Sequence, residues 1–211
     1  MMPSITPIPG PLPALLYSPS GPQAPPAVGW PLVLFLHGSG ERGRDLERVR
    51  LHGLPRELDR GRELPAFVLA PQCPEGSWWD TGALAALLDR VEAEFPTDPQ
   101  RVLVTGLSMG GYGSWALALA QPGRFAALVP VCGGGDPARA AEIRHIPQWI
   151  FHGALDEVVP PRRSEEMAEA LRACGADVRL TLYPDLGHNS WDRAYREEGL
   201  YSWLLGQVRR G

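Results

Sequence analysis

The chain contains no lysine, and all twenty of its basic residues are arginine. This absence excludes a Walker-type nucleotide site, a Schiff-base enzyme and a serine–lysine dyad, because each of these needs a lysine amine. No apolar run reaches the length of a membrane-spanning helix. The net charge of −4 provides no basic surface for nucleic acid or for an anionic membrane. We therefore expect a small-molecule partner, no nucleic acid and no membrane span.

Cysteine is scarce as well. The three cysteines, Cys73, Cys132 and Cys174, lie far apart and lack the spacing of a metal site. They are predicted to be reduced structural thiols, so the sequence implies no metal. The amino-terminal stretch has no charged leader, and prolines break its apolar run. We therefore expect no signal peptide and a cytoplasmic location.

Length and composition suit a single globular domain, because 44% of the 211 residues are hydrophobic. Residues 1–31 are rich in proline, glycine and serine and are expected to form an extended arm. Within this arm Leu12–Tyr17 suits an edge strand, where prolines are tolerated. Residues 32–211 show no internal repeat and no linker, so they are predicted to form one domain.

Short apolar runs alternate with helical patterns along this domain. The apolar runs are 32–36, 67–70, 102–105, 127–132, 149–151 and 178–183. The helical patterns are 45–60, 81–95, 108–121, 164–174 and 190–208. Gly53 and Pro55 interrupt the first pattern, which suits one or two short helices, and Gly199 is a candidate break in the last. This alternation predicts an α/β fold with a mostly parallel sheet of six or seven strands and helices on both faces. In such a sheet the ligand site lies beyond the carboxyl ends of the strands.

The central feature is the stretch Arg101–Ala120, which reads as a buried strand, a sharp turn and an apolar helix. The turn has the pattern G-x-S-x-G, with Ser108 between Gly106 and Gly110. This pattern between a strand and a helix is typical of a nucleophile elbow, which exposes the serine hydroxyl at the sheet edge. The alternative is a serine that simply caps the helix.

A nucleophilic serine needs a base, and the chain has five histidines. We predict His188, which follows the last strand on the glycine-bearing turn Leu186–Trp191. The other four are less suitable, because they end strands before a glycine or lie in polar or irregular stretches: His37, His52, His145 and His152.

The base in turn needs an acid that fixes its tautomer. We predict Asp156, which follows the fifth apolar run and completes the chain order nucleophile, acid, histidine. Three other carboxylates are rivals for this role, namely Glu157, Asp185 and Asp136.

The oxyanion of a tetrahedral intermediate needs two fixed donors. We predict the backbone amides of Met109, which follows the nucleophile, and of Ser39, in the loop after the first apolar run. The loop Gly38–Gly43 also matches G-x-G-x-x-G formally. A dinucleotide site would require an acidic residue at the end of the next strand, where Pro71 and Gln72 stand instead.

Three tryptophans stand next to these stretches. Trp78 and Trp79 follow the second apolar run, and Trp191 follows His188 by three residues. We predict that they contribute to a substrate pocket, since loops beyond strand ends face the site. The alternative is that they pack on the surface of the core.

With these residues in place, the chain resembles the α/β-hydrolase superfamily. It is most similar to the phospholipase/carboxylesterase (acyl-protein thioesterase-like) enzymes, the dienelactone hydrolases and the predicted peptidase-like esterases. The matching stretches are LHGSGERG, APQCPEGSWWD, GLSMGG, IFHGALDEVVP and YPDLGHNSW. The resemblance implies a triad of Ser108, Asp156 and His188, an oxyanion donor at Ser39, and tryptophans near the site. Dienelactone hydrolases proper use a cysteine nucleophile, whereas position 108 is serine.

Together these patterns predict a carboxylesterase-type serine hydrolase that cleaves carboxylic esters or thioesters through an acyl-enzyme, without a cofactor. The connection between the fourth and fifth apolar runs is too short for a helical cap, so we expect an open site. Two alternatives remain. One is a peptidase-like hydrolase on the same fold, and the other is a non-catalytic binding module.

Overall fold

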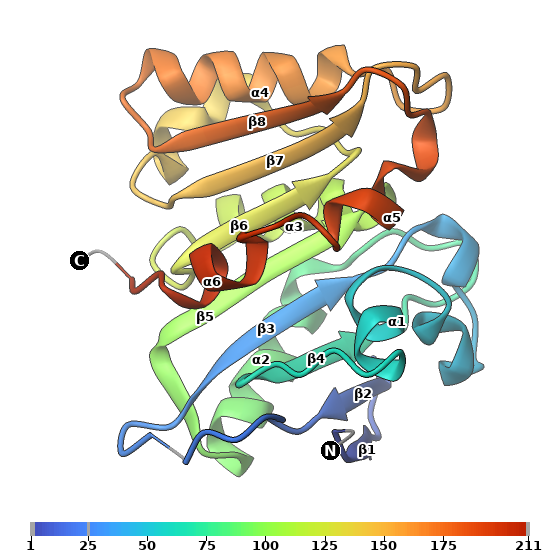
Figure 1. Ribbon diagram of the computed structural model, residues 1–211, viewed down its shortest axis with the longest axis vertical. Coiled ribbons are helices and arrows are strands. Elements are labelled where there is room, and N and C mark those ends of the chain that lie inside the picture. The colour runs from blue at the N-terminus through green and yellow to red at the C-terminus, as the bar shows by residue number, and fades with distance from the viewer. Residues whose placement is uncertain (1–2, 25, 210–211) are drawn as a thin grey trace.

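The computed structural model describes residues 3–24 and 26–209, which form an eight-stranded sheet with helices on both faces (Figure 1). The strand order is β1-β2-β4-β3-β5-β6-β7-β8. The strands are β1 Ile5–Ile8, β2 Ala14–Tyr17, β3 Trp30–Leu36, β4 Phe67–Pro71, β5 Thr97–Leu107, β6 Ala127–Val131, β7 Gln148–Gly153 and β8 Val178–Tyr183. Strands β3 to β8 pair in parallel, which confirms the predicted α/β class.

Helices cover both faces because the central strands are apolar on both sides. On one face α2, α3 and α4 pack against the sheet, and on the other face α1, α5 and α6 do so (Figure 1). The α-helices are α1 Gly53–Asp59, α2 Thr81–Glu94, α3 Met109–Ala120, α4 Arg162–Ala173, α5 Trp191–Ala194 and α6 Leu200–Leu205, and the short 3₁₀ helices are η1 Ser39–Glu41, η2 Leu46–Arg50, η3 Pro137–Ile143 and η4 His188–Ser190. None of the described helices is long and apolar enough to cross a membrane.

The amino-terminal arm differs from the prediction. It contributes two antiparallel strands, so the sheet has eight strands rather than six or seven. The expected edge strand at Leu12–Tyr17 begins at Ala14, pairs with β4 on one side, and is covered by β1 on the other. All four residues of β2 are buried for this reason, and β1 takes the edge position.

The segment between β3 and β4 also departs from the sequence pattern. Gly53 was expected to interrupt a helix, but α1 begins there with a φ of +64°. A side chain at this position would place its Cβ 2.4 Å from the Phe35 ring, so only glycine fits. Pro55 lies in the first turn of α1, where a missing N–H breaks no helical hydrogen bond.

The connection between β6 and β7 contains only the short helix η3. In the described part of the chain no helical cap therefore lies over the carboxyl ends of the strands. These ends carry the loops that hold every candidate site residue.

Candidate active site

Ser108 sits on a strained turn between β5 and α3. Its backbone has φ 53° and ψ −115°, a conformation that non-glycine residues rarely adopt. The turn is tight on both sides of the serine. A Cβ on Gly106 would lie 2.3 Å from the Gly110 carbonyl oxygen, and one on Gly110 would lie 1.9 Å from the Leu36 carbonyl oxygen. The two glycines thus allow the elbow that the G-x-S-x-G pattern predicts.

This crowding predicts a large loss of stability for Gly110→Ala. The added methyl would meet backbone rather than a movable side chain, so we expect the free energy of unfolding to fall by roughly 3 kcal/mol. Urea denaturation measures the change. Gly123→Ala is the matched control, because a Cβ on Gly123 would meet no atom within 4 Å. Equal stability of the two variants would show that the turn tolerates a side chain at position 110.

A continuous chain of hydrogen bonds runs from Ser108 to Asp156. The Ser108 Oγ lies 2.9 Å from the His188 Nε2, and the His188 Nδ1 lies 2.7 Å from the Asp156 Oδ2. The three residues follow β5, β7 and β8, whose carboxyl ends meet at one edge of the sheet (Figure 1). The structure thus brings together the nucleophile, acid and base candidates.

Asp156 is held on both of its oxygens. Its Oδ1 accepts hydrogen bonds from the amides of Val158 and Val159, each at 2.9 Å. Its Oδ2 accepts from His188, with His152 Nε2 also 3.2 Å away. Burial raises the pKa of Asp156, but the bonds from His188 and from the two amides outweigh burial and leave the pKa below its usual value. The carboxylate is therefore charged at neutral pH.

The rival carboxylates have other partners. Asp185 binds Arg193 through two bonds of 2.7 Å each, and Asp136 caps η3 by accepting from the amide of Ala138. Glu157 is exposed. Among the described contacts of the His188 ring, Asp156 is the one carboxylate partner.

The remaining histidines bond elsewhere. The Nε2 of His145 lies 2.7 Å from the Pro122 carbonyl, and His52 has its ring against Trp191. His37 bonds two backbone groups, the carbonyl of Gly38 and the amide of Cys73. His152 has a role that its strand-end position did not reveal. Its fully buried ring contacts both Ser164 and Asp156, and burial lowers its pKa, so it stays neutral.

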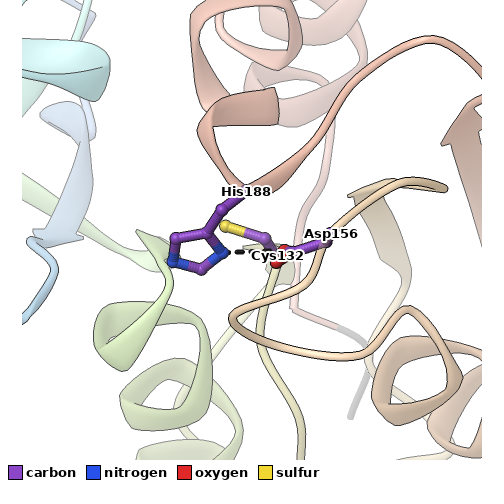
Figure 2. Close-up of side chains that lie close together, drawn as sticks. All are labelled: Cys132, Asp156 and His188. Atoms are coloured by element: carbon purple, nitrogen blue, oxygen red, sulfur yellow. Dashed lines mark hydrogen bonds and ion pairs between the residues drawn. The ribbon is translucent and has the colours of Figure 1, made fainter.

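A third polar group, the Cys132 thiol, lies beside Asp156 and His188, as Figure 2 shows. The candidate ligand atoms of these three residues lie within 4.8 Å of one another. Burial raises the pKa of Cys132 far above its ordinary value, so the thiol stays protonated. Since the Asp156 oxygens already have donors, this cluster does not suit a metal ion, which needs a thiolate and free lone pairs.

The two predicted oxyanion donors each begin a helix near Ser108. Met109 is the first residue of α3, and Ser39 is the first residue of η1. Neither amide donates to another described residue, so both N–H groups are available to a ligand. Gly38 brings the η1 loop next to the nucleophile, since a Cβ on Gly38 would lie 3.6 Å from the Ser108 Cβ.

A cavity of about 530 Å³ lies along α3. Ser108, Asp156 and His188 do not line it, and Tyr112 is the lining residue nearest to Ser108 in the sequence. Residues from three segments line it, among them Trp78, Trp79, Tyr112, Ala116, Gly134 and Arg139. Tyr112 and Arg139 carried no pattern by which the sequence alone could have marked them.

The three tryptophans take different positions. Trp78 is 66% exposed and stands edge-on to the Tyr112 ring at the cavity. Trp79 lines the same cavity, but it is buried and packs on His37. Trp191 does not line it and instead packs edge-on against the His188 ring, with centroids 5.2 Å apart.

The chain is similar to known proteins in both sequence and fold. The sequence model of the dienelactone hydrolase family matches residues 80–198, a range that includes Ser108, Asp156 and His188. The chain belongs to the dienelactone hydrolase family. This result, together with the fold, confirms the predicted relationship to α/β-hydrolases.

Two relatives of this dienelactone hydrolase family member are named depolymerases, and one similar solved structure is named an esterase. A poly(3-hydroxyoctanoate) depolymerase of Pseudomonas fluorescens is 30% identical over 204 residues, covering 79% of this chain and 70% of the relative. A poly(3-hydroxyalkanoate) depolymerase C of Paucimonas lemoignei is 29% identical, covering 60% of this chain and 32% of the relative. The crystal structure of a thermostable esterase superposes with a TM-score of 0.84 and 32% identity, covering 99% of this chain and 64% of that chain.

These relationships support the coarse prediction of a serine hydrolase with the α/β-hydrolase fold. The chain spans about a third of the second depolymerase and just under two thirds of the esterase. Serine at position 108 separates it from dienelactone hydrolases with a cysteine nucleophile.

Proposed function

We propose that the protein hydrolyses carboxylic esters, and thioesters of similar shape, through an acyl-enzyme on Ser108. The hydroxyl attacks the substrate carbonyl carbon while His188 Nε2 takes its proton. Asp156 holds the ring so that Nδ1 carries a proton, and it stabilises the imidazolium that forms. His188 then protonates the leaving alkoxide or thiolate, and it later activates the water that releases the acid.

One observation carries this proposal: the uninterrupted hydrogen-bond chain from the Ser108 hydroxyl through His188 to the buried Asp156 carboxylate. The strain at Ser108 supports it further, because strained backbone clusters at functional sites. A binding module would have no need of a strained serine joined to a base and an acid.

Reaction with a fluorophosphonate tests the proposal. We expect one covalent adduct, located on Ser108 by peptide mass spectrometry, together with turnover of a p-nitrophenyl ester by the same preparation. Heat-denatured protein serves as the control, since its serine has no base. An absence of both adduct and turnover in folded protein would overturn the enzymatic proposal and favour a binding module.

For the oxyanion, we propose donation from the amides of Met109 and Ser39. The substitution Ser39→Pro tests the second donor, because it removes the N–H. Proline fits the first position of a helix, and Gly38 before it has the extended conformation that proline requires, with φ −79° and ψ −177°. Loss of this N–H is expected to lower kcat by a factor on the order of 10² to 10³.

Steady-state kinetics on a p-nitrophenyl ester measure this effect. Ser39→Ala is the comparison variant, because it removes the hydroxyl and keeps the amide, and it should lose far less activity. If the two variants lose the same activity, the amide of Ser39 is not the donor.

We also propose that the cavity along α3 holds the apolar group of the substrate, with Trp78 and Trp79 on one side of it. The names of two relatives point to polyesters with alkyl groups, and apolar residues such as Trp79, Ala116 and Leu119 line the cavity. Tyr112 and Ala120 stand eight residues apart on α3, which is roughly 12 Å along the helix. Trp191 contributes to the site by packing against the ring of His188, the proposed base.

Narrowing this cavity should discriminate between short and long esters. Ala116 is exposed on its floor, and we expect Ala116→Leu to raise KM for an octanoyl ester roughly ten-fold while affecting an acetyl ester little. Ala93→Leu, on the exposed surface of α2, is the matched control. Equal effects of Ala116→Leu on both esters would show that the chain lies elsewhere.

A further inference from the structure

The peptide group that carries the Ser39 amide is held by buried side chains on both sides of Gly38. The Gly38 amide donates to the Glu41 Oε2 at 2.9 Å, and the Gly38 carbonyl lies 2.6 Å from the His37 Nδ1. Both side chains are buried, with Glu41 7% and His37 1% exposed. Two successive peptide groups are therefore anchored next to the nucleophile.

The neighbours of His37 determine which of its nitrogens carries the proton. The amide of Cys73 donates to the His37 Nε2 at 3.0 Å, so this nitrogen must accept. Burial lowers the pKa of His37 to about 4, which leaves the ring neutral at neutral pH. The proton is consequently on Nδ1, which donates to the Gly38 carbonyl.

This bond orients the oxyanion donor. The Gly38 carbonyl and the Ser39 N–H belong to one planar trans peptide, in which they point in opposite directions. A carbonyl drawn toward His37 therefore turns the Ser39 N–H away from the His37 ring. Gly38 has no side chain to resist a peptide flip, so its conformation depends on the anchors at its two ends.

We propose that Glu41 is a positioning residue, an inference that rests on the proposed function. Its carboxylate holds the Gly38 amide and, together with His37, keeps the Ser39 N–H aimed at the oxyanion. Glu41 is itself fixed through its backbone carbonyl, which accepts from the buried Gln72 Nε2 at 2.9 Å. Its second carboxylate oxygen faces the His52 ring, 3.9 Å from Nε2. Glu41 touches no reacting atom, so it acts through the amide of Ser39.

Substitution of Glu41 tests this role. We expect Glu41→Ala to lower kcat roughly ten- to hundred-fold with little change in KM, because part of the oxyanion stabilisation is lost. Glu41→Gln should recover most of the activity, since its amide oxygen can accept from Gly38. Glu41→Met keeps the side-chain volume without an acceptor and should match Glu41→Ala. Glu47→Ala, at an exposed glutamate on η2, is the control.

The decisive measurement combines these changes with Ser39→Pro, with thermal unfolding used to show that each variant is folded. If Glu41 acts through the Ser39 amide, Glu41→Ala or Glu41→Met should cost almost nothing further once that amide is gone. An equal loss of kcat in both backgrounds, or no rescue by Glu41→Gln, would overturn the proposal. These outcomes can be distinguished from failure of the proposed function. If the protein is not a serine hydrolase, the unmodified protein would show neither a fluorophosphonate adduct nor turnover.

Discussion

Replacing Ser108 with alanine is expected to lower kcat by a factor on the order of 10⁶. The substitution removes the oxygen proposed to attack the substrate and leaves the His188–Asp156 pair in place. The residual rate would come from binding and the oxyanion donors alone. The fold should persist, because the elbow is fixed by Gly106 and Gly110 rather than by the hydroxyl.

Ester turnover and fluorophosphonate labelling both measure this effect. Ser202→Ala is a suitable control, because this serine on α6 is exposed and its hydroxyl donates to the Gly199 carbonyl. Turnover within about ten-fold of the unmodified protein after Ser108→Ala would place the nucleophile elsewhere, since nucleophile removal costs several orders of magnitude.

Asp156→Asn is expected to lower kcat by about 10⁴-fold, and the local contacts explain why. The amides of Val158 and Val159 both need an acceptor, so the asparagine oxygen must take the Oδ1 position. The NH₂ group then faces the His188 Nδ1. This arrangement favours the tautomer with the proton on Nε2, which cannot accept the proton of Ser108.

The matched control is Asp185→Asn, the rival acid nearest to His188 in sequence. Asp185 binds Arg193 at the surface, so its substitution should leave kcat nearly unchanged. If Asp185 is the acid, Asp185→Asn would lose activity and Asp156→Asn would remain active.

Several elements were predictable because neighbouring residues determine them. The strand Val178–Tyr183 has the predicted bounds, and α2 begins at Thr81 as its pattern indicates. Other elements are longer than their local pattern predicts. Strand β5 begins at Thr97 instead of Val102, because Thr97 pairs with Trp30 although its own neighbours are polar. Pairing with a distant strand is not visible in a local pattern.

The same limit applies to the site. Spacing and turn chemistry singled out Ser108, His188 and Asp156, but several carboxylates met the sequence criteria for the acid. Only the fold distinguishes them, because contact with His188 depends on the order and register of β7 and β8. The neighbouring thiol of Cys132 and the contact of His152 with Asp156 had no sequence signal either.

The sequence by itself determined which reactive groups and sharp turns the chain has. These are a serine on a strand–turn–helix elbow, a histidine and an acid in hydrolase order, and glycines where the backbone must turn sharply. These features depend on residues close together in the chain. Tertiary structure alone decided which acid meets the histidine, which way the Gly38–Ser39 peptide faces, and where a cavity opens along α3. Those properties depend on the packing of loops many residues apart, and strand order and register set their distances.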